Sequence, residues 1–365
     1  MKILVVSHSS VIEYHQQKLE ILAKDYGHEI TLVTPPWWME GGVRAEAFTG
    51  GSIKYRIGKT FVFKKRAFHF YFDAGRIIKE ENPDIVHVEE EPFTFACFQF
   101  LSAAKKRGKK TVFFTWENIR RRHNPGYEFF NNYCIKNTDA AIAGNNEGRD
   151  ILVEKGCRAP VYVIPQYGIN MKDFILRGGD APKRDYKIGY VGRILPEKGI
   201  VVLIDALSGI PDARLVMAGT GASGYTALVR EAAEKKLAGR HEFTGFVERE
   251  KMGRLLASLD ILVLPSLTTK TWKEQFGRVI AEAFASGVPV IGSGSGEIPN
   301  VIGDAGLVFK EGSSADLAGK IMHLMADGEL YKSCAEKGTK RVLEHYTNEG
   351  IAAKLDFVYR ALLKR

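Results

Sequence analysis

The sequence predicts an α/β protein made of two Rossmann-like, doubly wound domains in tandem, with a cleft between them. Short apolar runs alternate with amphipathic helical stretches in the first half, and the same alternation restarts in the second half. A polar, glycine-bearing stretch from Gly178 to Asp185 between the halves is typical of a linker. The chain has 365 residues, enough for two domains, which we expect at 1–170 and 171–346.

The elements expected in the first half form a parallel sheet that helices cover on both faces. The predicted strands are Ile3 to Val6, Ile30 to Val33, Ile85 to Val88, Val112 to Phe114, Ala140 to Ala143 and Val161 to Ile164. The predicted helices include Tyr14 to Lys24, Phe70 to Glu81 and Thr94 to Arg107. A β-rich run from Ile53 to Phe63 interrupts the alternation.

The second half repeats this order. Its predicted strands are Ile188 to Val191, Leu215 to Ala218, Phe243 to Gly245, Ile261 to Leu264 and Val288 to Gly292. Its predicted helices include Ile200 to Leu207, Tyr225 to Lys236, Glu250 to Ser258 and Arg278 to Ser286. In doubly wound sheets, ligands bind at the carboxyl ends of the strands. The loops that follow the strands are therefore the places to look for chemistry.

Composition bounds the class of protein. A hydrophobic content of 45% with 26% charged residues is that of a soluble globular protein. No apolar run approaches the roughly 20 residues that span a bilayer, and the start of the chain lacks the pattern of a signal peptide. The four cysteines have no metal-ligand spacing, so we expect reduced, packing thiols in a cytoplasmic protein: Cys97, Cys134, Cys157 and Cys334.

The net charge of +9 is concentrated in basic runs of the first half. These runs are Lys64 to Arg66, Lys105 to Arg107 with Lys109 and Lys110, and Arg120 to Arg122. Aromatic clusters lie beside them, from Phe61 to Phe63 and from Phe68 to Phe72. The runs are either a solvated surface or a face attracted to an anionic membrane. We expect no nucleic-acid partner, since no recognised motif for one occurs.

Two glutamates with seven residues between them mark one loop of the second half. Glu274 lies before the helix that starts at Arg278, and Glu282 lies two turns inside it. The backbone N–H groups near Phe276 and Gly277 would be available at the helix N-terminus, where a phosphate binds favourably. One carboxylate for sugar hydroxyls, one for a ribose and amides for phosphate together indicate a nucleotide-sugar site. The spacing alone also fits acids that favour the helix dipole.

Three other strand-end loops of the second half carry candidates for the same site. Gly192 and Arg193 follow the first strand, and Lys198 lies five residues beyond Arg193, so both cations could reach a diphosphate or could be ordinary surface charges. Gly219 and Gly221 permit a tight turn and close backbone approach by a ligand. The backbone groups of Phe246 and Val247 could contact a base edge. No Asp-x-Asp pair, the usual sign of a metal-bridged diphosphate, occurs in the sequence.

Five motifs follow one another along the second half: Gly-Arg-x(4)-Lys-Gly, Gly-x-Gly, Glu-x(7)-Glu, Gly-Val-Pro-Val-Ile-Gly and Gly-Glu-Ile-Pro. With the motifs in this order, the chain resembles the retaining GT-B glycosyltransferases of family 4. The resemblance covers most of residues 187–310 and extends more loosely to a closing helix over 347–365, which would return to the first domain. It implies that Arg193 and Lys198 bind the donor diphosphate, that Glu274 contacts the donor sugar and that Glu282 holds the ribose. The Phe276 and Gly277 amides would contact sugar and phosphate. Retention by front-face attack needs no protein nucleophile.

The first half would carry the acceptor and differs from the family pattern. Many members have a glycine pair after the first strand, where this chain has Ser7-His8-Ser9-Ser10. Glu117, in Thr115-Trp116-Glu117-Asn118, occupies the place of a family histidine. It could accept hydrogen bonds from sugar hydroxyls or act as a base, or it could pair with Arg120 or Arg121. Further polar candidates, of lower rank, are Asn118, His8 and His123.

The sequence therefore predicts a metal-independent, retaining glycosyltransferase without a cofactor. The donor would be a nucleoside diphosphate sugar, and the acceptor a glycan or lipid-linked saccharide at the inner membrane face. A nucleotide-sugar epimerase or hydrolase of the same fold and a non-catalytic nucleotide-sugar-binding protein stay open as alternatives. An NAD-dependent oxidoreductase is disfavoured, because no Gly-x-Gly-x-x-Gly follows the first strand.

Overall fold

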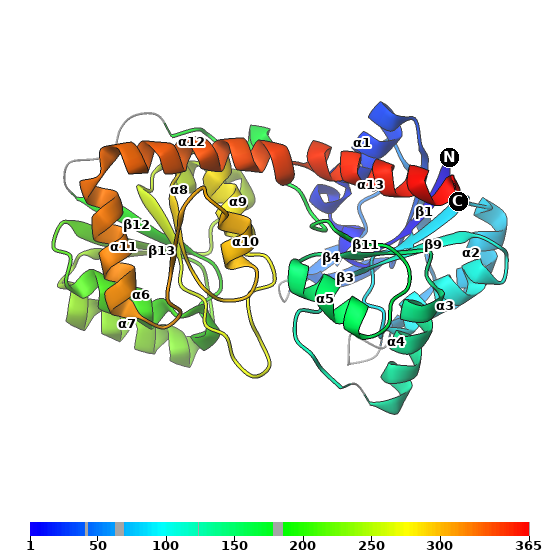
Figure 1. Cartoon of the computed structure of the whole chain (residues 1–365), viewed down its shortest axis with the longest axis horizontal. Helices are drawn as coiled ribbons and strands as arrows, with labels where there is room; N and C mark the ends of the chain where they lie inside the picture. Colours follow the sequence, from blue (N-terminus) through cyan, green and yellow to red (C-terminus); the bar gives the residue numbers. More distant parts are fainter. Residues whose placement is uncertain (41–42, 63–68, 123, 178–184, 365) are drawn as a thin grey trace. The chain divides into compact units, whose positions relative to one another are not determined.

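The structure, a computed structural model, describes residues 1–40, 43–62, 69–122, 124–177 and 185–364 (Figure 1). The chain divides into two compact units: Met1–Gly168 with Asn348–Arg365, and Ile169–Thr347. These bounds lie within two residues of the expected domain limits at 170 and 346. Most of the predicted linker, the basic run 64–66 and His123 lie outside the described residues.

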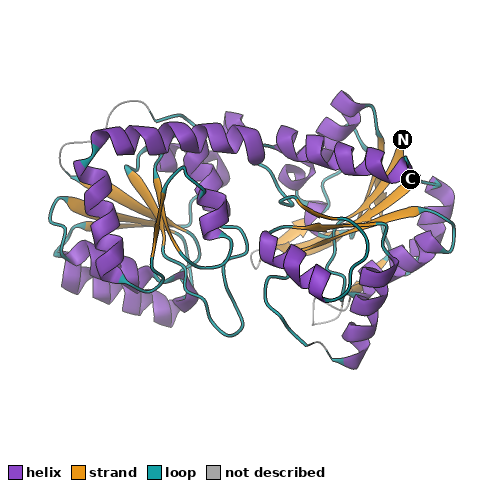
Figure 2. Cartoon of the chain, viewed as in Figure 1, coloured by secondary structure: helices purple, strands orange, loops and turns teal. Residues whose placement is uncertain are grey.

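The first unit is built on a seven-stranded sheet in the order β11-β10-β9-β8-β1-β2-β5, in which all neighbouring strands are parallel (Figure 2). The strands are β1 (Lys2–Val6), β2 (Glu29–Thr34), β5 (Lys54–Ile57), β8 (Ile85–Val88), β9 (Lys110–Thr115), β10 (Ala140–Ala143) and β11 (Val161–Val163). The apolar runs that predicted strands are buried because helices cover both faces of the sheet.

Alternate residues of β1 show the two faces of this sheet. Ile3 and Val5 pack in one core with α1 (Gln17–Tyr26) and α13 (Asn348–Leu363). Leu4 and Val6 pack in the other core with α2 (Ala74–Glu81), α3 (Phe95–Lys105) and α4 (Pro125–Asn137). Helix α5 (Asn146–Glu154) lies between β10 and β11 in the sequence.

Two antiparallel hairpins interrupt the alternation in the first unit. They pair β3 (Trp37–Glu40) with β4 (Val43–Glu46), and β6 (Thr60–Val62) with β7 (His69–Tyr71). The predicted helix from Phe70 was wrong in its first turn, because Phe70 and Tyr71 belong to β7 and α2 begins at Ala74. Cross-strand aromatic packing explains the difference: the Phe61 and Phe70 rings lie 5.7 Å apart. Helix α1 likewise begins at Gln17, after a short 3-10 turn over Glu13–Gln16.

Helix α13 belongs to the first unit although it is the last element of the chain. It packs against α1 and contacts the sheet through polar groups. The Tyr359 hydroxyl lies 2.7 Å from His87 Nδ1 on β8, and Asp356 Oδ1 lies 2.7 Å from His28 Nε2. The last helix therefore completes the first core.

The second unit contains a six-stranded parallel sheet in the order β14-β13-β12-β15-β16-β17. Its strands are β12 (Tyr186–Val191), β13 (Ala213–Ala218), β14 (His241–Gly245), β15 (Ile261–Leu264), β16 (Val290–Ser293) and β17 (Leu307–Phe309). Its helices are α6 (Ile200–Ser208), α7 (Ser223–Leu237), α8 (Arg249–Ala257), α9 (Arg278–Ala285), α10 (Ile298–Ile302), α11 (Ser314–Ala326) and α12 (Gly328–His345). The predicted fold class of two doubly wound α/β domains is confirmed.

Two further features concern composition. All four cysteines are free thiols, and three of them are buried. In the described part of the chain, no helix has both the length and the apolar character needed to cross a membrane.

The buried His87 predicts a defined loss of stability in acid. Burial lowers the pKa of His87 from 6.5 to about 4, so the unfolded chain binds a proton that the folded chain does not. The contribution of His87 to the free energy of unfolding is complete above pH 6.5. It decreases as the pH falls towards 4, by up to about 1.4 kcal/mol per pH unit. A His87→Gln variant, which cannot titrate, should lose less stability over this window in thermal unfolding. The exposed His323→Gln should retain the wild-type profile, and a His87→Gln profile parallel to wild type would contradict the assignment.

Candidate functional site

In each sheet, the order in which the strands follow one another reverses direction at one point, which we call the break in strand order. It lies between β12 and β15 in the second unit and between β1 and β8 in the first. Chain segments leave the flanking strands in different directions there, which opens a crevice at the carboxyl edge of a parallel sheet. Each sequence-predicted donor residue follows a strand of the second sheet or lies in the helix after it. The acceptor candidates Glu117, Asn118 and His8 follow strands of the first sheet.

The loop after β12 is joined to the loop after β13 by their backbones. Gly192 donates its N–H to Ala218 O at 2.9 Å, and Ile194 donates to Thr220 O at 2.8 Å. The Tyr190 hydroxyl on β12 donates to Arg193 O at 2.6 Å and holds the backbone of the loop after β12 in place. The Arg193 side chain is exposed at this edge.

Glycine is required where these two loops meet. Gly219 has a φ of +142°, and a Cβ added there would lie 1.8 Å from Gly192 O. At Gly221 the added Cβ would lie 2.0 Å from Ile194 O. Contacts this short exclude any side chain, so the Gly-x-Gly sequence permits the two loops to pack backbone to backbone.

Lys198 and Glu274 form a direct ion pair across two loops. Lys198 ends a 3-10 turn over Pro196–Lys198, and its Nζ donates to Glu274 Oε2 at 2.7 Å. The same oxygen accepts from the Ser266 hydroxyl at 2.9 Å, and Lys198 Nζ lies 4.5 Å from the centre of the Trp272 ring. Both charged side chains are nearly nine-tenths buried. The structure thus brings together two of the predicted site residues, and the sequence reasoning missed Ser266 and Trp272.

The segment from Glu274 to Glu282 is fixed at both ends. Gly277, with a φ of +74°, caps α9, and the Phe276 ring packs edge-on against Tyr346 at 5.4 Å. Inside the helix, Glu282 pairs with Arg278 at 3.1 Å, a contact between neighbouring turns. The predicted loop-to-helix junction is therefore correct as local structure, and its carboxylates lie on separate elements.

Val247, the predicted base-contacting residue, lies two residues beyond β14 and is half-buried, whereas its neighbour Phe246 is 76% exposed. Near the end of β14 lies a cavity of about 370 Å³ with glycine backbone on one side and helix α7 on the other. Its walls are formed by Gly219, Thr220, Gly221, Ser223, Thr226, Ala227, Arg230 and Gly245.

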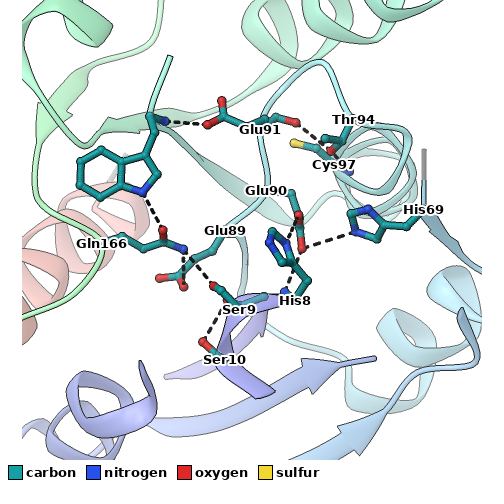
Figure 3. A network of polar contacts seen from close by, with 12 residues as sticks. His8, Ser9, Ser10, His69, Glu89, Glu90, Glu91, Thr94, Cys97 and Gln166 are labelled. Atoms are coloured by element: carbon teal, nitrogen blue, oxygen red, sulfur yellow. Dashed lines mark hydrogen bonds and ion pairs between the residues drawn. The ribbon is translucent and has the colours of Figure 1, made fainter. Parts of the chain in front are cut away.

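In the first unit, polar side chains gather where β1 and β8 end (Figure 3). Three consecutive acids follow β8: Glu89 and Glu90 are buried, and Glu91 is partly buried. Glu89 forms a buried ion pair with Lys18, whose Nζ also donates to Gln166 O at 2.6 Å. Glu90 Oε2 lies 2.6 Å from His8 Nδ1.

Glu91 is held differently from its two neighbours. Its carboxylate accepts from Thr115 Oγ1 at 2.5 Å and from Trp116 N at 2.8 Å. Burial raises the pKa of Glu91 to about 7. The sequence reasoning missed all three acids, although acids placed between an apolar strand and Pro92 were a signal that could have found them.

Glu117 is 7% exposed and forms an ion pair with Lys155 at 2.6 Å. Arg120, which the sequence offered as its partner, pairs with Glu154 at 2.7 Å instead. Lys155 is a partner from the end of α5, close in space and distant in sequence. Asn118 is 4% exposed beside it.

The segment that replaces a glycine pair after β1 forms a short 3-10 turn over Ser9–Val11. Its serines are buried, and Ser10 donates its hydroxyl to Ser7 at 2.9 Å. Hydroxyl groups therefore fill the space that glycines would leave open. His8 stays partly exposed, with 30% of its side chain accessible.

Two doubly wound units whose polar clusters lie at the carboxyl edges of their sheets define a protein of the GT-B fold. Anabaena Alr3699/HepE, solved in complex with UDP and glucose, shares this fold, with a TM-score of 0.71, 19% identity and 99% of both chains covered.

The family follows from sequence comparison. Residues 171–341 match the family described as glycosyl transferases group 1, and residues 20–167 match glycosyltransferase family 4. The chain therefore belongs to the glycosyltransferases that these two models describe, those of family 4 and group 1, and it is a glycosyltransferase.

Two curated relatives illustrate the range of similarity. The N-acetyl-alpha-D-glucosaminyl L-malate synthase of Bacillus anthracis is 31% identical over 155 residues, which is 42% of this chain and 39% of that enzyme. The phosphatidylinositol N-acetylglucosaminyltransferase gpi3 subunit of Schizosaccharomyces pombe is 26% identical over 365 residues, or 96% of this chain and 77% of that subunit.

The contact between the Gly192 and Gly219 loops predicts a large effect of one methyl group. Gly219→Ala should destabilise the protein by at least about 2 kcal/mol, because the added Cβ meets backbone that has nowhere to move. Gly224→Ala is the matched control, since nothing lies within 4 Å of its Cβ position at the start of α7. Chemical unfolding measures both, and equal stability of the two variants would show that the loops are not in contact.

Proposed function

We propose that this glycosyltransferase moves a sugar from a nucleoside diphosphate sugar with retention of configuration, and that the second unit binds the donor. The observation that carries the proposal is the Lys198–Glu274 ion pair at the carboxyl edge of the second sheet, with Arg193 on the same loop as Lys198. A cation and a carboxylate held together there suit a ligand that presents phosphate beside sugar hydroxyls. The complex of the similar HepE with UDP and glucose is consistent with such a donor.

Arg193 and Lys198 would bind the diphosphate, whose negative charge grows as the sugar departs. Fixed cations stabilise this charge without a metal ion bridging the phosphates. Gly192 and Gly219 would permit close approach, and the Phe276 and Gly277 amides at the start of α9 would contact phosphate and sugar. Glu282 would hold the ribose, and Val247 would contact the base through its backbone.

Donor binding would exchange the partners of the central ion pair. Lys198 would turn from Glu274 to a phosphate oxygen, and Glu274 would then accept hydrogen bonds from the sugar hydroxyls. Ser266, which donates to the same carboxylate oxygen, would keep Glu274 oriented during the exchange. Front-face attack would make Glu274 a positioning group, with the acceptor proton passing to the departing phosphate oxygen.

The first unit would bind the acceptor, with Glu117, Asn118 and His8 as the polar candidates. The ion pair with Lys155 holds Glu117 at this edge of the sheet, where its carboxylate would accept hydrogen bonds from sugar hydroxyls. We propose a glycan or lipid-linked saccharide of the cell envelope as the acceptor. The relative in fission yeast bears the name of a phosphatidylinositol-modifying enzyme, which supports a lipid acceptor.

An aromatic surface on the first unit supports action beside a membrane. We define this surface as the linked rings of Phe61, Phe70, Phe72, Phe95, Phe98, Phe129 and Phe130. Phe72 is 68% exposed and Phe129 is 59% exposed. The exposed Arg122 precedes α4 and supplies positive charge for anionic headgroups.

The proposed donor site predicts that its cations and its carboxylate affect different steps, nucleotide binding and sugar transfer. UDP, GDP, ADP or TDP should raise the melting temperature, to the same extent in excess EDTA as in Mg²⁺. Lys198→Ala and Arg193→Ala should each weaken binding of the most strongly stabilising nucleotide by about tenfold or more. Glu274→Gln should bind it at least as tightly, because Lys198 no longer leaves a carboxylate, yet its sugar transfer should fall by about a hundredfold.

Lys332→Ala, an exposed lysine on α12 of the same unit, is the control and should match wild type. If no nucleoside diphosphate stabilises the protein, the donor site is misassigned. Release of nucleotide or interconversion of the sugar without any acceptor requirement would instead favour a hydrolase or an epimerase. Binding without turnover would favour a sensor.

The aromatic surface predicts attachment to anionic vesicles. The protein should sediment with phosphatidylserine-containing vesicles and much less with phosphatidylcholine alone. A Phe72→Ser, Phe129→Ser double variant should reduce this binding by about tenfold or more, because two exposed rings no longer enter the headgroup region. Phe357→Ser is the matched control, since Phe357 is 64% exposed on α13, which covers the other face of the sheet. Equal loss in the control would contradict this surface.

A further inference from the structure

Three metal-ligating side chains meet at the carboxyl edge of the first sheet. His8 follows β1, His69 begins β7 and Glu90 follows β8, and Figure 3 shows both imidazoles turned toward the Glu90 carboxylate. One ligand atom of each residue lies within 4.8 Å of the others. His8 Nδ1 is 2.6 Å from Glu90 Oε2, and His69 Nε2 is 3.6 Å from Glu90 Oε1.

The cluster is built into the fold and is open on one side. The side chains of His69 and Glu90 are each 1% exposed, whereas that of His8 is 30% exposed. The Trp38 ring covers both imidazoles, with its centre 4.4 Å from that of His8 and 5.0 Å from that of His69. An ion could therefore enter past His8 and would be shielded by Trp38 on another side.

The buried charge of Glu90 gives a reason for a cation here. Burying an isolated carboxylate costs several kcal/mol, so it is normally paired with a positive group. The nearby buried ammonium of Lys18 pairs with Glu89. The partners of Glu90 are the His8 and His69 imidazoles, and in their neutral forms they leave its charge to be balanced by a bound cation.

We propose that His8, His69 and Glu90 bind one divalent transition-metal ion of the zinc class. Two imidazole nitrogens and one carboxylate oxygen are a ligand set that such ions favour, and a fourth position stays open for water or another oxygen ligand. Ligand atoms around tetrahedral zinc lie about 3.3 Å apart, given bonds of about 2.0–2.1 Å. The contact between His8 and Glu90 must open to that separation, and the wider separations, of up to 4.8 Å, must close to it.

The ion would join the ends of three elements that are distant in sequence. It lies in the first unit, whereas the residues proposed to hold the donor diphosphate lie in the second. The site therefore does not depend on the proposed donor binding, and it leaves the donor phosphates to Arg193 and Lys198. It does include His8, which is also one of the candidates proposed for the acceptor. Coordination through His8 Nδ1 requires loss of the proton on that nitrogen, so binding should weaken as the pH falls.

Cobalt provides a direct test, because tetrahedral Co²⁺ has intense visible absorption that octahedral Co²⁺ in water lacks. The protein, stripped with a chelator, should bind one Co²⁺ per chain with this signal, and Zn²⁺ should displace it. Zn²⁺ should also raise the melting temperature, since it binds only the folded site. Elemental analysis after gel filtration counts the retained ion.

Glu90→Gln and His69→Gln should lose the cobalt signal and weaken zinc by a hundredfold or more. His8→Ala should weaken zinc by at least tenfold and should fold normally, because His8 is the exposed member of the set. His345→Gln, which changes a partly exposed histidine of the second unit, should bind zinc as the wild type does. An absent cobalt signal in the folded wild type, or its persistence in Glu90→Gln, would overturn the proposal and leave a hydrogen-bonded His–Glu–His cluster.

Discussion

The break in strand order within each parallel sheet is the constraint on which the rest of this molecule depends. Strands that run in one direction place all their carboxyl ends on one edge, and the chain leaves that edge to opposite faces at the break. In the first unit, the ends of β1 and β8 meet there and bring His8 next to Glu90. In the second unit, the break lies between β12 and β15, whose loops supply Lys198 and Glu274. Residues separated widely along the chain become neighbours at these two places.

Close backbone contact then makes the carboxyl edge of the second sheet rigid. Gly219 lies against Gly192, and Gly296 lies so close to Glu274 that an added Cβ would be 2.0 Å from its carbonyl oxygen. Contacts of this kind fix the backbone of the loops, so the charged side chains need little reordering when a ligand binds. Lys198 and Glu274 neutralise each other before that step, which lets two charges remain nearly buried. Under the proposed function, a donor with both phosphate and hydroxyl groups would offer new partners to both side chains together.

Local sequence predicted much of the fold and part of this site. The strands β8, β10 and β15 coincide with the expected apolar runs, and the loop-to-helix junction at Arg278 is correct. The β6–β7 hairpin was missed because its pairing depends on aromatic contacts between strands. The partner of Glu117 was missed because Lys155 is 38 residues away in sequence, and Lys18 is 71 residues from Glu89. Apolar periodicity is a local signal, whereas the pairing of a buried charge is decided by the tertiary fold.

The three acids after β8 show how one strand end can place neighbouring carboxyl groups in different electrostatic surroundings. Burial raises the pKa of Glu89, but the charges of Lys18 and His87 and the hydrogen bonds from Lys18 and Gln166 together outweigh it, so the pKa lies below its ordinary value. Glu90 faces two imidazoles, and burial brings the pKa of Glu91 to about 7. Well-packed apolar residues would stabilise such a position at least as well as buried charges do. Because Glu89 and Glu90 are buried at the edge where doubly wound sheets bind ligands, the proposed binding of a cation or a polar substrate there gives their burial a reason that stability of the fold does not.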